Sequence, residues 1–545
     1  MSKVPKSLIS NLQSPSVWAK VVFVIILGLL AAPQLWYPFG FDQGVYAACG
    51  DVIRRGGIPI QDCFETKQPG VMVMYAIPML FSLSPVAVHA FTLLWTALTS
   101  LLIAGVARWL LHPSAAWPAA AFYWLAYAGI NYWSMDQAET FANLFLVVAV
   151  YAAWRAGERR GWRWLVIGGA AIGICFWFKY VFGLFGIALA LVLVLHTWRS
   201  RSRALIGSAL LNGAVFGMTA LSVVGLGLAC YALTNALPAL ASQFQFLQAA
   251  FPLGPPRTPP EILAQLMRFA DNGADITAAF KATTPQWIVL GGGFPLLFVL
   301  AFIGAWRSLK RGAMAYLYLL AIFVAGAAVV VWQANYIQYH YTSMIPPLAL
   351  AAGGASQGLN WQPAPAGDRP GALARFAGVG VAIIMAAAVI LLAVRMLPWV
   401  NDTWQNVVLL GKSPRDIYLE SAVAPNVPVA EYISAHTAPG DTIAIFGDAP
   451  WVYTLANRRN ATRFSFINLW LRKREAVTYP LFTQQYLDGL IRNQPVYFIL
   501  AKPNFPWPNN DYIPDYKAAG AIYEFVESHY AYEGENGPFL LYHRK

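Results

Sequence analysis

Residues 21–46, which read VVFVIILGLLAAPQLWYPFGFDQGVY, decide the class of this protein. Residues 17–36 form an apolar run long enough to cross a lipid bilayer, since a spanning helix needs about 20 residues. The acidic residue Asp42 follows only a few positions after that run ends. Asp42 has two interpretations: it caps a helix that begins near Gly44, or it is a catalytic carboxylate held at the membrane surface.

The composition of the whole chain is typical of a protein embedded in a membrane. Of its 545 residues, 58% are hydrophobic and only 11% are charged, whereas soluble domains carry roughly 25% charged residues. The 21 Trp and 26 Tyr residues suit the aromatic belts at membrane interfaces. The net charge of +12 resides in short loops between apolar runs, which indicates membrane topology and argues against a nucleic-acid-binding surface.

Apolar runs recur along the chain and predict eleven transmembrane helices. Basic residues such as Arg155, Arg199 and Arg307 collect in short loops that all fall on one side if there are eleven spans. The positive-inside rule assigns that side, and the N-terminus with it, to the cytoplasm. The first span then serves as a retained signal anchor. The predicted spans are residues 17–36, 86–111, 114–134, 140–157, 163–179, 181–197, 204–235, 286–306, 312–333, 341–356 and 373–397.

Two long loops face outward in this topology. Residues 37–85 contain two amphipathic stretches, residues 44–55 and 69–83, which predict short helices on the membrane surface. Residues 236–285 contain the Pro-rich stretch FPLGPPRTPPE, which a helix does not tolerate, and predict a loop.

The end of the chain differs in character from the rest. Residues 398–545 are more polar, and the runs DTIAIFG (441–447) and PVYFILAK (495–502) alternate as strands do. The stretch VPVAEYISAHT between polar segments predicts a helix. The expected architecture is therefore an α-helical polytopic membrane domain, residues 1–397, followed by a soluble periplasmic α/β domain, residues 398–545.

Ionisable residues gather on the outward side, although they come from separate parts of the chain. Such residues are costly near a bilayer unless they serve a function. A carboxylate can accept the proton of an attacking hydroxyl, and lysine or histidine can hold the negative charge of a departing phosphate. The pattern predicts transfer of a group from a lipid-linked phosphate. The residues are Asp42, Glu65, Lys67, Asp136, Glu139, Lys179 and His340.

Several of these stretches resemble the C-type glycosyltransferases, in particular the protein O-mannosyltransferase and aminoarabinose-transferase group. Residues 41–76, FDQGVYAACGDVIRRGGIPIQDCFETKQPGVMVMYA, are similar to the first-loop signature of that family. The segment Gln137–Glu139 resembles the family's Q-x-E pattern, and Lys179 resembles the lysine that ends the fifth span. HYTSMIPPLAL, residues 340–350, resembles the H-Y-x-x-x-x-P-P-L motif, and residues 429–464 are similar to the outer domain.

The resemblance implies a role for each matching residue. Asp42 corresponds to the catalytic base, Lys67 to the lysine that contacts the lipid-linked phosphate, and Glu65 to the acidic residue two positions before that lysine. Lys179 and His340 are expected to bind the donor phosphate as well. The chain departs from the family pattern at Gln43, which replaces an acidic residue, and at Thr66, which replaces a histidine.

The position of Thr66 bears on a metal site. In the aminoarabinose transferases an acidic residue directly before the lysine holds a metal, and Thr66 occupies that place here. Glu65 with Asp136 or Glu139 still offers the oxygen ligands that divalent cations prefer, and these acids also suit contact with an acceptor. The question of a metal ion stays open at this stage.

Each candidate also has a plain structural interpretation. Asp136 and Glu139 fit the start of a helix, where acids are stabilised by the helix dipole. Lysines at the ends of spans snorkel to the interface, and His340 fits a satisfied interfacial histidine. The arginine pairs are expected to be less specific: Arg54 and Arg55 suit lipid head groups, and Arg458 and Arg459 suit a solvated turn better than a path for the acceptor.

The cysteines indicate no metal site, because none of the four has CxxC spacing. Cys175 and Cys230 lie in apolar runs and are expected to be core residues. Cys49 and Cys63 fall in the same outward loop, where a disulfide between them is one alternative and free thiols are the other.

The function expected from these observations is that of a bacterial inner-membrane glycosyltransferase. It would transfer a sugar from a polyprenyl-phosphate donor, with inversion, to a hydroxyl of a lipid such as that of lipopolysaccharide, of a glycan or of a protein on the periplasmic face. A lipid-linked saccharide transporter or flippase is one alternative, although such proteins bury charge at mid-membrane. A non-catalytic membrane scaffold is the other.

Overall fold

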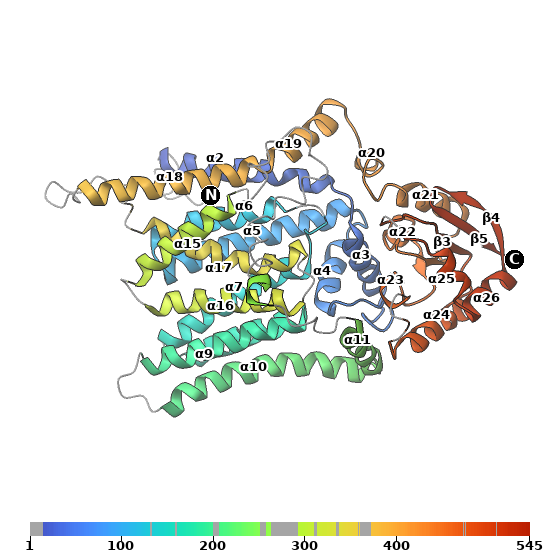
Figure 1. Ribbon diagram of the computed structural model, residues 1–545, viewed down its shortest axis with the longest axis horizontal. Coiled ribbons are helices and arrows are strands. Elements are labelled where there is room, and N and C mark those ends of the chain that lie inside the picture. Colours follow the sequence, from blue (N-terminus) through green and yellow to red (C-terminus); the bar gives the residue numbers. More distant parts are fainter. Residues whose placement is uncertain are drawn as a thin grey trace, which may run out of the picture.

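The computed structural model describes residues 15–130, 133–158, 161–199, 206–250, 258–262, 293–309, 313–333, 337–357, 359, 372–471, 474, 476–507 and 510–545. A bundle of long helices and a C-terminal unit that contains a β-sheet lie at opposite ends of the molecule (Figure 1). Helices α3, α4 and α11 lie between them (Figure 1).

Each of the eleven predicted apolar runs contains a helix of the bundle. These helices are α2 (Pro15–Ala31), α5 (Pro85–Leu110), α6 (Ala116–Ala128), α7 (Ala138–Glu158), α8 (Trp162–Phe176), α9 (Gly183–Arg199), α10 (Ile206–Leu233), α15 (Phe294–Leu309), α16 (Ala313–Gln333), α17 (Ile345–Gly353) and α18 (Ala372–Val394). Short 3-10 segments flank several of them: η1 (Ala32–Trp36), η2 (Pro113–Ala115), η3 (Tyr180–Phe182), η5 (Gln338–Met344) and η6 (Gly354–Ser356).

Not all of these helices are long enough to cross a bilayer alone. Within the described residues, six helices are long and apolar enough to do so, or seven if α2 and α3 (Phe41–Arg54), bent by 78°, form one broken span. Helices α6, α8 and α17 have 13, 15 and 9 residues, and a helix rises only about 1.5 Å per residue. The multi-pass helical class is confirmed, and the number of eleven crossings stays a prediction.

The two short helices predicted in the first loop are present as α3 and α4 (Pro69–Met79). They pack against each other, and α3 also packs against α22 (Trp451–Leu455) of the C-terminal unit. Glycines make both contacts close: a Cβ atom on Gly44 would lie 3.1 Å from the backbone nitrogen of Trp451, and one on Gly50 would lie 3.1 Å from that of Ala76. Helix α3 is thus enclosed between two partners, unlike the surface helix that its amphipathic pattern predicted.

The second outward loop is not a loop throughout. Its first part is helix α11 (Leu237–Ala250), which buries Leu240, Gln243 and Phe246. The prediction of a loop from residue 236 is wrong here, because apolar residues at helical spacing outweigh the distant prolines. Most of the remaining loop, residues 251–257 and 263–285, lies outside the described residues.

The C-terminal unit is built on a mixed five-stranded sheet with the order β2-β1-β3-β5-β4. Strand β1 pairs in parallel with β2 and β3, and β5 pairs antiparallel with β3 and β4. The central strands TIAIF and YFILA are almost wholly buried, as expected when helices cover both faces of a sheet. The strands are β1 (Thr442–Phe446), β2 (Arg459–Asn460), β3 (Tyr497–Ala501), β4 (Tyr530–Asn536) and β5 (Phe539–Arg544).

The strands and the helix predicted in this region are present. Helix α19 (Leu397–Thr403) and the π-helical segment η7 (Trp404–Leu409) continue from α18, and α19 contacts α2 and η1 of the bundle (Figure 1). The helices that follow them are α20 (Pro414–Tyr418), α21 (Asn426–His436), α22, α23 (Asn468–Leu471), α24 (Tyr479–Asn493), α25 (Ile513–Lys517) and α26 (Ala521–His529). Whether the unit folds as a separate soluble domain from residue 398 stays a prediction.

The first loop is joined to the C-terminal unit and to itself. Cys49 and Cys63 form a disulfide between α3 and the loop that follows it. Phe64 forms a β-bridge with Phe464, and its backbone nitrogen donates to the Arg463 carbonyl at 2.6 Å. These links hold the segment before Lys67 in a defined position between bundle and sheet.

Candidate active site

Asp42 lies in the first turn of α3, which begins three residues earlier than the sequence predicts. The N-cap residue is Gly40, whose backbone nitrogen donates to Gln43 Oε1 at 2.5 Å. Asp42 is therefore not the capping residue, and its side chain stays 24% exposed. A carboxylate in the first turn is stabilised by the positive end of the helix dipole.

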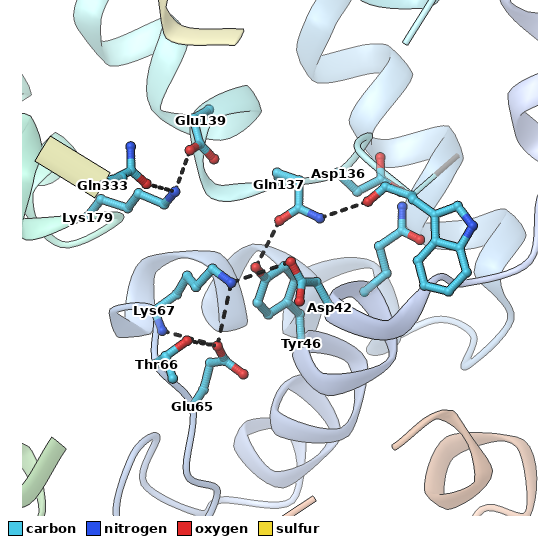
Figure 2. A network of polar contacts seen from close by, with 12 residues as sticks. Asp42, Tyr46, Glu65, Thr66, Lys67, Asp136, Gln137, Glu139, Lys179 and Gln333 are labelled. Carbon is cyan, nitrogen blue, oxygen red and sulfur yellow. Dashed lines mark hydrogen bonds and ion pairs between the residues drawn. The ribbon is translucent and has the colours of Figure 1, made fainter. Parts of the chain in front are cut away.

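Lys67 and Glu65 from the end of the first loop meet Asp42 (Figure 2). Lys67 Nζ lies 3.4 Å from Asp42 Oδ2 and 3.9 Å from Glu65 Oε1. Glu65 Oε1 also accepts from the Thr66 hydroxyl at 2.8 Å and from the Lys67 backbone nitrogen at 3.2 Å. One lysine thus serves two carboxylates, and one of those, Glu65, is almost fully buried.

Burial and charge act in opposite directions in this group. Burial raises the pKa of Glu65, and the nearby Lys67 ammonium only partly offsets this. Burial alone would lower the pKa of Lys67, but the carboxylates of Asp42 and Glu65 hold that pKa well above its ordinary value. Because Glu65 is buried more completely than Lys67, desolvation determines the direction of the pKa shift of the glutamate, and the neighbouring charges determine that of the lysine. Lys67 is therefore a cation at neutral pH.

A second ion pair lies beside the first. Lys179, between α8 and η3, contacts Glu139 Oε1 at the start of α7 and donates to Gln333 Oε1 at 2.7 Å (Figure 2). The Lys179 and Glu139 side chains are 7% and 0% exposed. Charged groups buried to this degree must be paired, and this pair meets that requirement.

Tyr339 joins the two ion pairs. Its ring centroid lies 5.6 Å from Lys67 Nζ and 5.2 Å from Lys179 Nζ, within reach of cation–π attraction. Its hydroxyl interacts electrostatically with the Asp42 carboxylate. The neighbouring His340 is buried, and burial together with the charges of Lys179 and Lys67 holds its pKa well below the ordinary value. His340 is therefore neutral, and it can donate a hydrogen bond but carries no charge for a phosphate.

Asp136 serves a different neighbourhood from the lysines. Its Oδ2 atom lies 2.5 Å from His89 Nδ1 of α5, and neither side chain is exposed. His89 Nε2 lies 3.0 Å from the Tyr37 carbonyl oxygen, just before the turn into α3. Asp136 also adopts a left-handed backbone conformation, with φ of 57°, which costs a non-glycine residue some energy. The pair supports the backbone from which Asp42 projects.

The segment around Asp136 also holds α3 directly. Gln43 Nε2 donates to the Met135 carbonyl at 2.9 Å, and the Tyr46 hydroxyl donates to Gln137 Oε1 at 2.9 Å (Figure 2). From the other side, Gln243 of α11 donates to the carbonyl oxygens of Glu65 and Lys67. These contacts fix both halves of the group that contains Asp42 and Lys67.

The arrangement of the carboxylates does not fit a divalent cation. Within the described ranges, no three His, Cys, Asp or Glu side chains come close enough together to hold a metal ion. Glu65 faces Lys67, Glu139 faces Lys179 and Asp136 faces His89. The three acids considered as ligands thus each face a cationic or basic partner.

The sequence motifs identified the charged residues of the site but not the residues that position them. Tyr46, Tyr339, Gln243 and Gln333 were not expected to contribute, although Tyr339 directly precedes His340 in one of the motifs. A role for His89 could have been predicted from the sequence, because it is a histidine inside a mostly apolar helix. A buried histidine in that setting needs partners for both ring nitrogens.

Comparisons with known proteins agree with this description. Residues 68–226 match the family model for dolichyl-phosphate-mannose-protein mannosyltransferases. The chain is similar to the structure of ArnT from Cupriavidus metallidurans bound to undecaprenyl phosphate, with 15% identity, a TM-score of 0.52, and coverage of 97% of this chain and 98% of that chain. The apo form of ArnT has the same identity and coverage and a TM-score of 0.51.

A further structure is less similar. The apo oligosaccharyltransferase from Archaeoglobus fulgidus has 12% identity and a TM-score of 0.47, over 90% of this chain and 70% of that chain. No curated protein sequence matches the chain. The family-model match over residues 68–226 and the ArnT structures confirm the resemblance to the C-type glycosyltransferases that the motifs indicate, and the chain shares the fold of ArnT.

Proposed function

We propose that this protein is an integral-membrane glycosyltransferase that takes a sugar from a polyprenyl-phosphate donor. The observation that carries the proposal is the contact between the part-exposed carboxylate of Asp42 and the ammonium group of Lys67, at 3.4 Å. A base and a phosphate-binding cation beside each other are what transfer from a lipid-linked phosphate to a hydroxyl requires. The match to a mannosyltransferase family model and the undecaprenyl phosphate bound by ArnT support this donor class.

Asp42 acts as the general base. One of its oxygens takes the proton of the acceptor hydroxyl as the hydroxyl oxygen attacks the anomeric carbon. The bond between that carbon and the phosphate oxygen breaks, and its electron pair stays on the phosphate. Attack opposite to the leaving phosphate inverts the anomeric configuration. The ion pair with Lys67 holds the Asp42 carboxylate in position.

The two lysines stabilise the departing phosphate, which gains one negative charge. Of the two carboxylates near it, only Asp42 is within hydrogen-bond range of Lys67 Nζ. The other N–H donors of Lys67 are therefore available to phosphate oxygens. Lys179 uses two of its three donors on Glu139 and Gln333. Since both ammonium groups lie within about 6 Å of the Tyr339 ring centroid, they are near enough to each other to bind the same phosphate, and His340 adds a neutral donor.

The membrane supports the remaining part of the proposal. A polyprenyl tail stays in the lipid while its phosphate meets the lysines at the end of the bundle. By the positive-inside rule the N-terminus is cytoplasmic, and the site and the C-terminal unit are periplasmic, at the bacterial inner membrane. The acceptor is a hydroxyl of a lipid, a glycan or a protein.

The experiment that tests this function is mass spectrometry of lipids and glycoconjugates from a deletion strain. The strain is complemented with wild type, with Asp42→Asn, or with Asp511→Asn as a matched control, because Asp511 is an exposed aspartate of the C-terminal unit. We expect a polyprenyl-phosphate sugar to accumulate in the deletion strain, and wild type and the control to clear it.

Asp42→Asn should leave the lipid-linked sugar in place and the product absent. The conjugate that loses mass in the deletion strain names the acceptor. Full complementation by Asp42→Asn would refute the assignment of the base. Uptake of the lipid-linked sugar across proteoliposome membranes, without transfer, would replace the transferase with a flippase.

A further inference from the structure

A cavity of about 730 Å³ lies between the first outward loop and the C-terminal unit. Its walls are the end of α3, the loop that contains Cys63, the start of α11, and the segment from β2 to α24. Asp42, Lys67 and Lys179 are not among the residues that line it. Ligand-binding pockets commonly enclose ~300–1,000 Å³, so this cavity has room for a small saccharide.

The cavity is cationic. Its charged lining consists of Arg55, Arg458, Arg459, Arg463 and Arg492, against Asp51, Asp62 and Asp488. Asp51 is already neutralised by Arg54 at 2.5 Å and Arg55 at 2.7 Å. The other four arginines form no ion pair with any described residue. Asp62 and Asp488 offset only part of this charge, and the remaining excess of guanidinium ions favours an anionic ligand.

The arginines differ in burial and in their hydrogen-bond partners. Arg458 is buried, not in a solvated turn as the sequence suggested, and it donates to backbone carbonyls that include those of Ser434 and Thr437. It is part of the frame of the cavity. Arg459 and Arg492 are exposed and are the cations most available to a ligand.

Arg463 is held rigidly in the wall. Its Nη2 donates to the Ile60 carbonyl at 2.7 Å, its Nη1 donates to Gln485 at 3.1 Å, and its guanidinium lies 5.4 Å from the ring centroids of Phe64 and Phe464. Its Nε atom is buried and has no partner within the described structure. Burial lowers the pKa of Arg463 to about 10, and the charge of Asp62 offsets this only in part.

Ser465 provides a second unsatisfied polar group in the same wall. It is 1% exposed, and its hydroxyl has no hydrogen-bond partner among the described residues. A buried hydroxyl without a partner costs free energy that a ligand can recover. A saccharide offers hydroxyl groups for Ser465, and an acidic substituent offers charge for the arginines.

We propose that this cavity binds an anionic saccharide, such as one carrying a carboxylate or a phosphate, as a remote part of the acceptor. The assignment to the acceptor rests on the proposed function. Helix α3 connects the two sites: Asp42 lies in its first turn and Asp51 in the cavity wall, which are separated by about 14 Å at 1.5 Å per residue. The cavity therefore holds a sugar that lies beyond the one that reacts.

The spacing between the two sites is fixed by covalent and backbone links. The disulfide between Cys49 and Cys63 ties the cavity wall to α3. The bridge between Phe64 and Phe464 ties the same loop to the sheet. An acceptor held in the cavity is thus placed at a set distance from Asp42, which selects acceptors with an acidic sugar at the matching position.

The first test measures binding to the full-length protein in phosphatidylcholine nanodiscs. The probe is digalacturonic acid, with lactose as its neutral counterpart. We expect digalacturonate to bind and lactose not to bind. Arg459→Gln with Arg492→Gln should weaken binding at least tenfold, and Ala239→Trp should do the same by filling the cavity without a change of charge. Arg415→Gln, which alters an exposed ion pair outside the cavity, should have no effect.

Two results would overturn the site: no binding of digalacturonate to wild type, or equal binding to the cavity variants. Binding is also measured with Asp42→Asn, which should match wild type, so that this test is independent of transfer. In the complemented deletion strain, the cavity variants should lower the amount of product at an unchanged protein level. If they lose probe binding but form product normally, the ligand is not part of the acceptor, whereas failure of the proposed function itself appears as full complementation by Asp42→Asn.

Discussion

Lys67 and Lys179 place their ammonium groups against the same aromatic ring, 5.6 Å and 5.2 Å from the centroid of Tyr339. Two cations repel each other, and each is held where it is by its own carboxylate, Asp42 or Glu139. An electron-rich ring within reach of both lowers the cost of this proximity. In the proposed function, these two positive groups bind one doubly charged phosphate.

Substitution of Tyr339 separates the two contributions of this residue. Tyr339→Phe keeps the ring but loses the hydroxyl that interacts with Asp42, so we expect binding of undecaprenyl phosphate to be retained and turnover to fall. Tyr339→Leu also loses the ring, and cation–π contacts of about 1–2 kcal/mol correspond to roughly tenfold weaker binding. Titration of both variants in nanodiscs checks this, and equal binding by the two would mean that the ring contributes nothing.

Replacement of Lys67 tests the phosphate contact. We expect Lys67→Met to weaken undecaprenyl phosphate binding by about 10- to 100-fold, because a hydrogen bond to a charged group contributes ~1.5–3 kcal/mol. Lys67→Arg should recover only part of the loss, since a planar guanidinium does not replace a compact ammonium group. Lys412→Met, at a part-exposed lysine paired with Glu420, is the control, and an unchanged affinity in Lys67→Met would refute the contact.

The buried Glu65 makes stability depend on pH. Because burial raises its pKa in the folded protein above the ordinary value of 4.5, its contribution to stability is present at low pH and is lost as the pH rises through the folded-state pKa. We therefore expect Glu65→Gln to unfold at a higher temperature than wild type at about pH 8, with the difference shrinking toward about pH 5. Thermal unfolding in nanodiscs at several pH values measures this. A lower unfolding temperature of the variant at every pH would show that the pairing with Lys67 outweighs desolvation.

The His89–Asp136 pair is expected to position Asp42 through its contact with the Tyr37 carbonyl, before the start of α3. His89→Ala leaves a buried carboxylate without its partner, and breaking such a pair costs about 3–5 kcal/mol. Adding Asp136→Asn should restore part of that stability, because the uncompensated charge is then gone. Turnover should stay low in the double variant, since the Tyr37 carbonyl has lost its donor. If turnover recovers along with the unfolding temperature, the pair has a purely structural role.

The disulfide between Cys49 and Cys63 should contribute to stability through the loop that it closes. Its sequence separation is 14, and a loop of this size corresponds to about 3 kcal/mol in the chain-entropy model. We expect Cys49→Ser with Cys63→Ser to lower the unfolding temperature. Cys230→Ser, at an exposed free cysteine, should leave the unfolding temperature unchanged. An equal temperature for the double variant and wild type would contradict the expectation.

The sequence predicted best those features whose residues lie close together along the chain. The first-loop motif identified Asp42, Glu65 and Lys67 together, because they belong to one continuous segment that folds back on itself. Periodicity located the helices of the bundle, since apolar runs of this length have few other structures available. The strands TIAIF and YFILA were predicted from short runs that alternate as strands do.

The remaining features depend on contacts between distant segments. His89 meets Asp136 across 47 positions, and Gln243 meets Glu65 across 178. No local pattern encodes such pairs, so Asp136 was considered as a metal ligand, and the helix that carries Gln243 was expected to be part of a loop. The burial of α3 could not be predicted either, because its amphipathic pattern does not indicate that the C-terminal unit packs against it.

The bridge between Phe64 and Phe464 joins two segments that are synthesised at different times. The segment that carries Lys67 is synthesised early, but the partner with which Phe64 forms its β-bridge follows some 400 residues later. Until the C-terminal unit has been synthesised, the helices of the bundle can form while Lys67 and Asp42 are not yet held in their final positions. The candidate site would thus be assembled only after the C-terminal unit has been made.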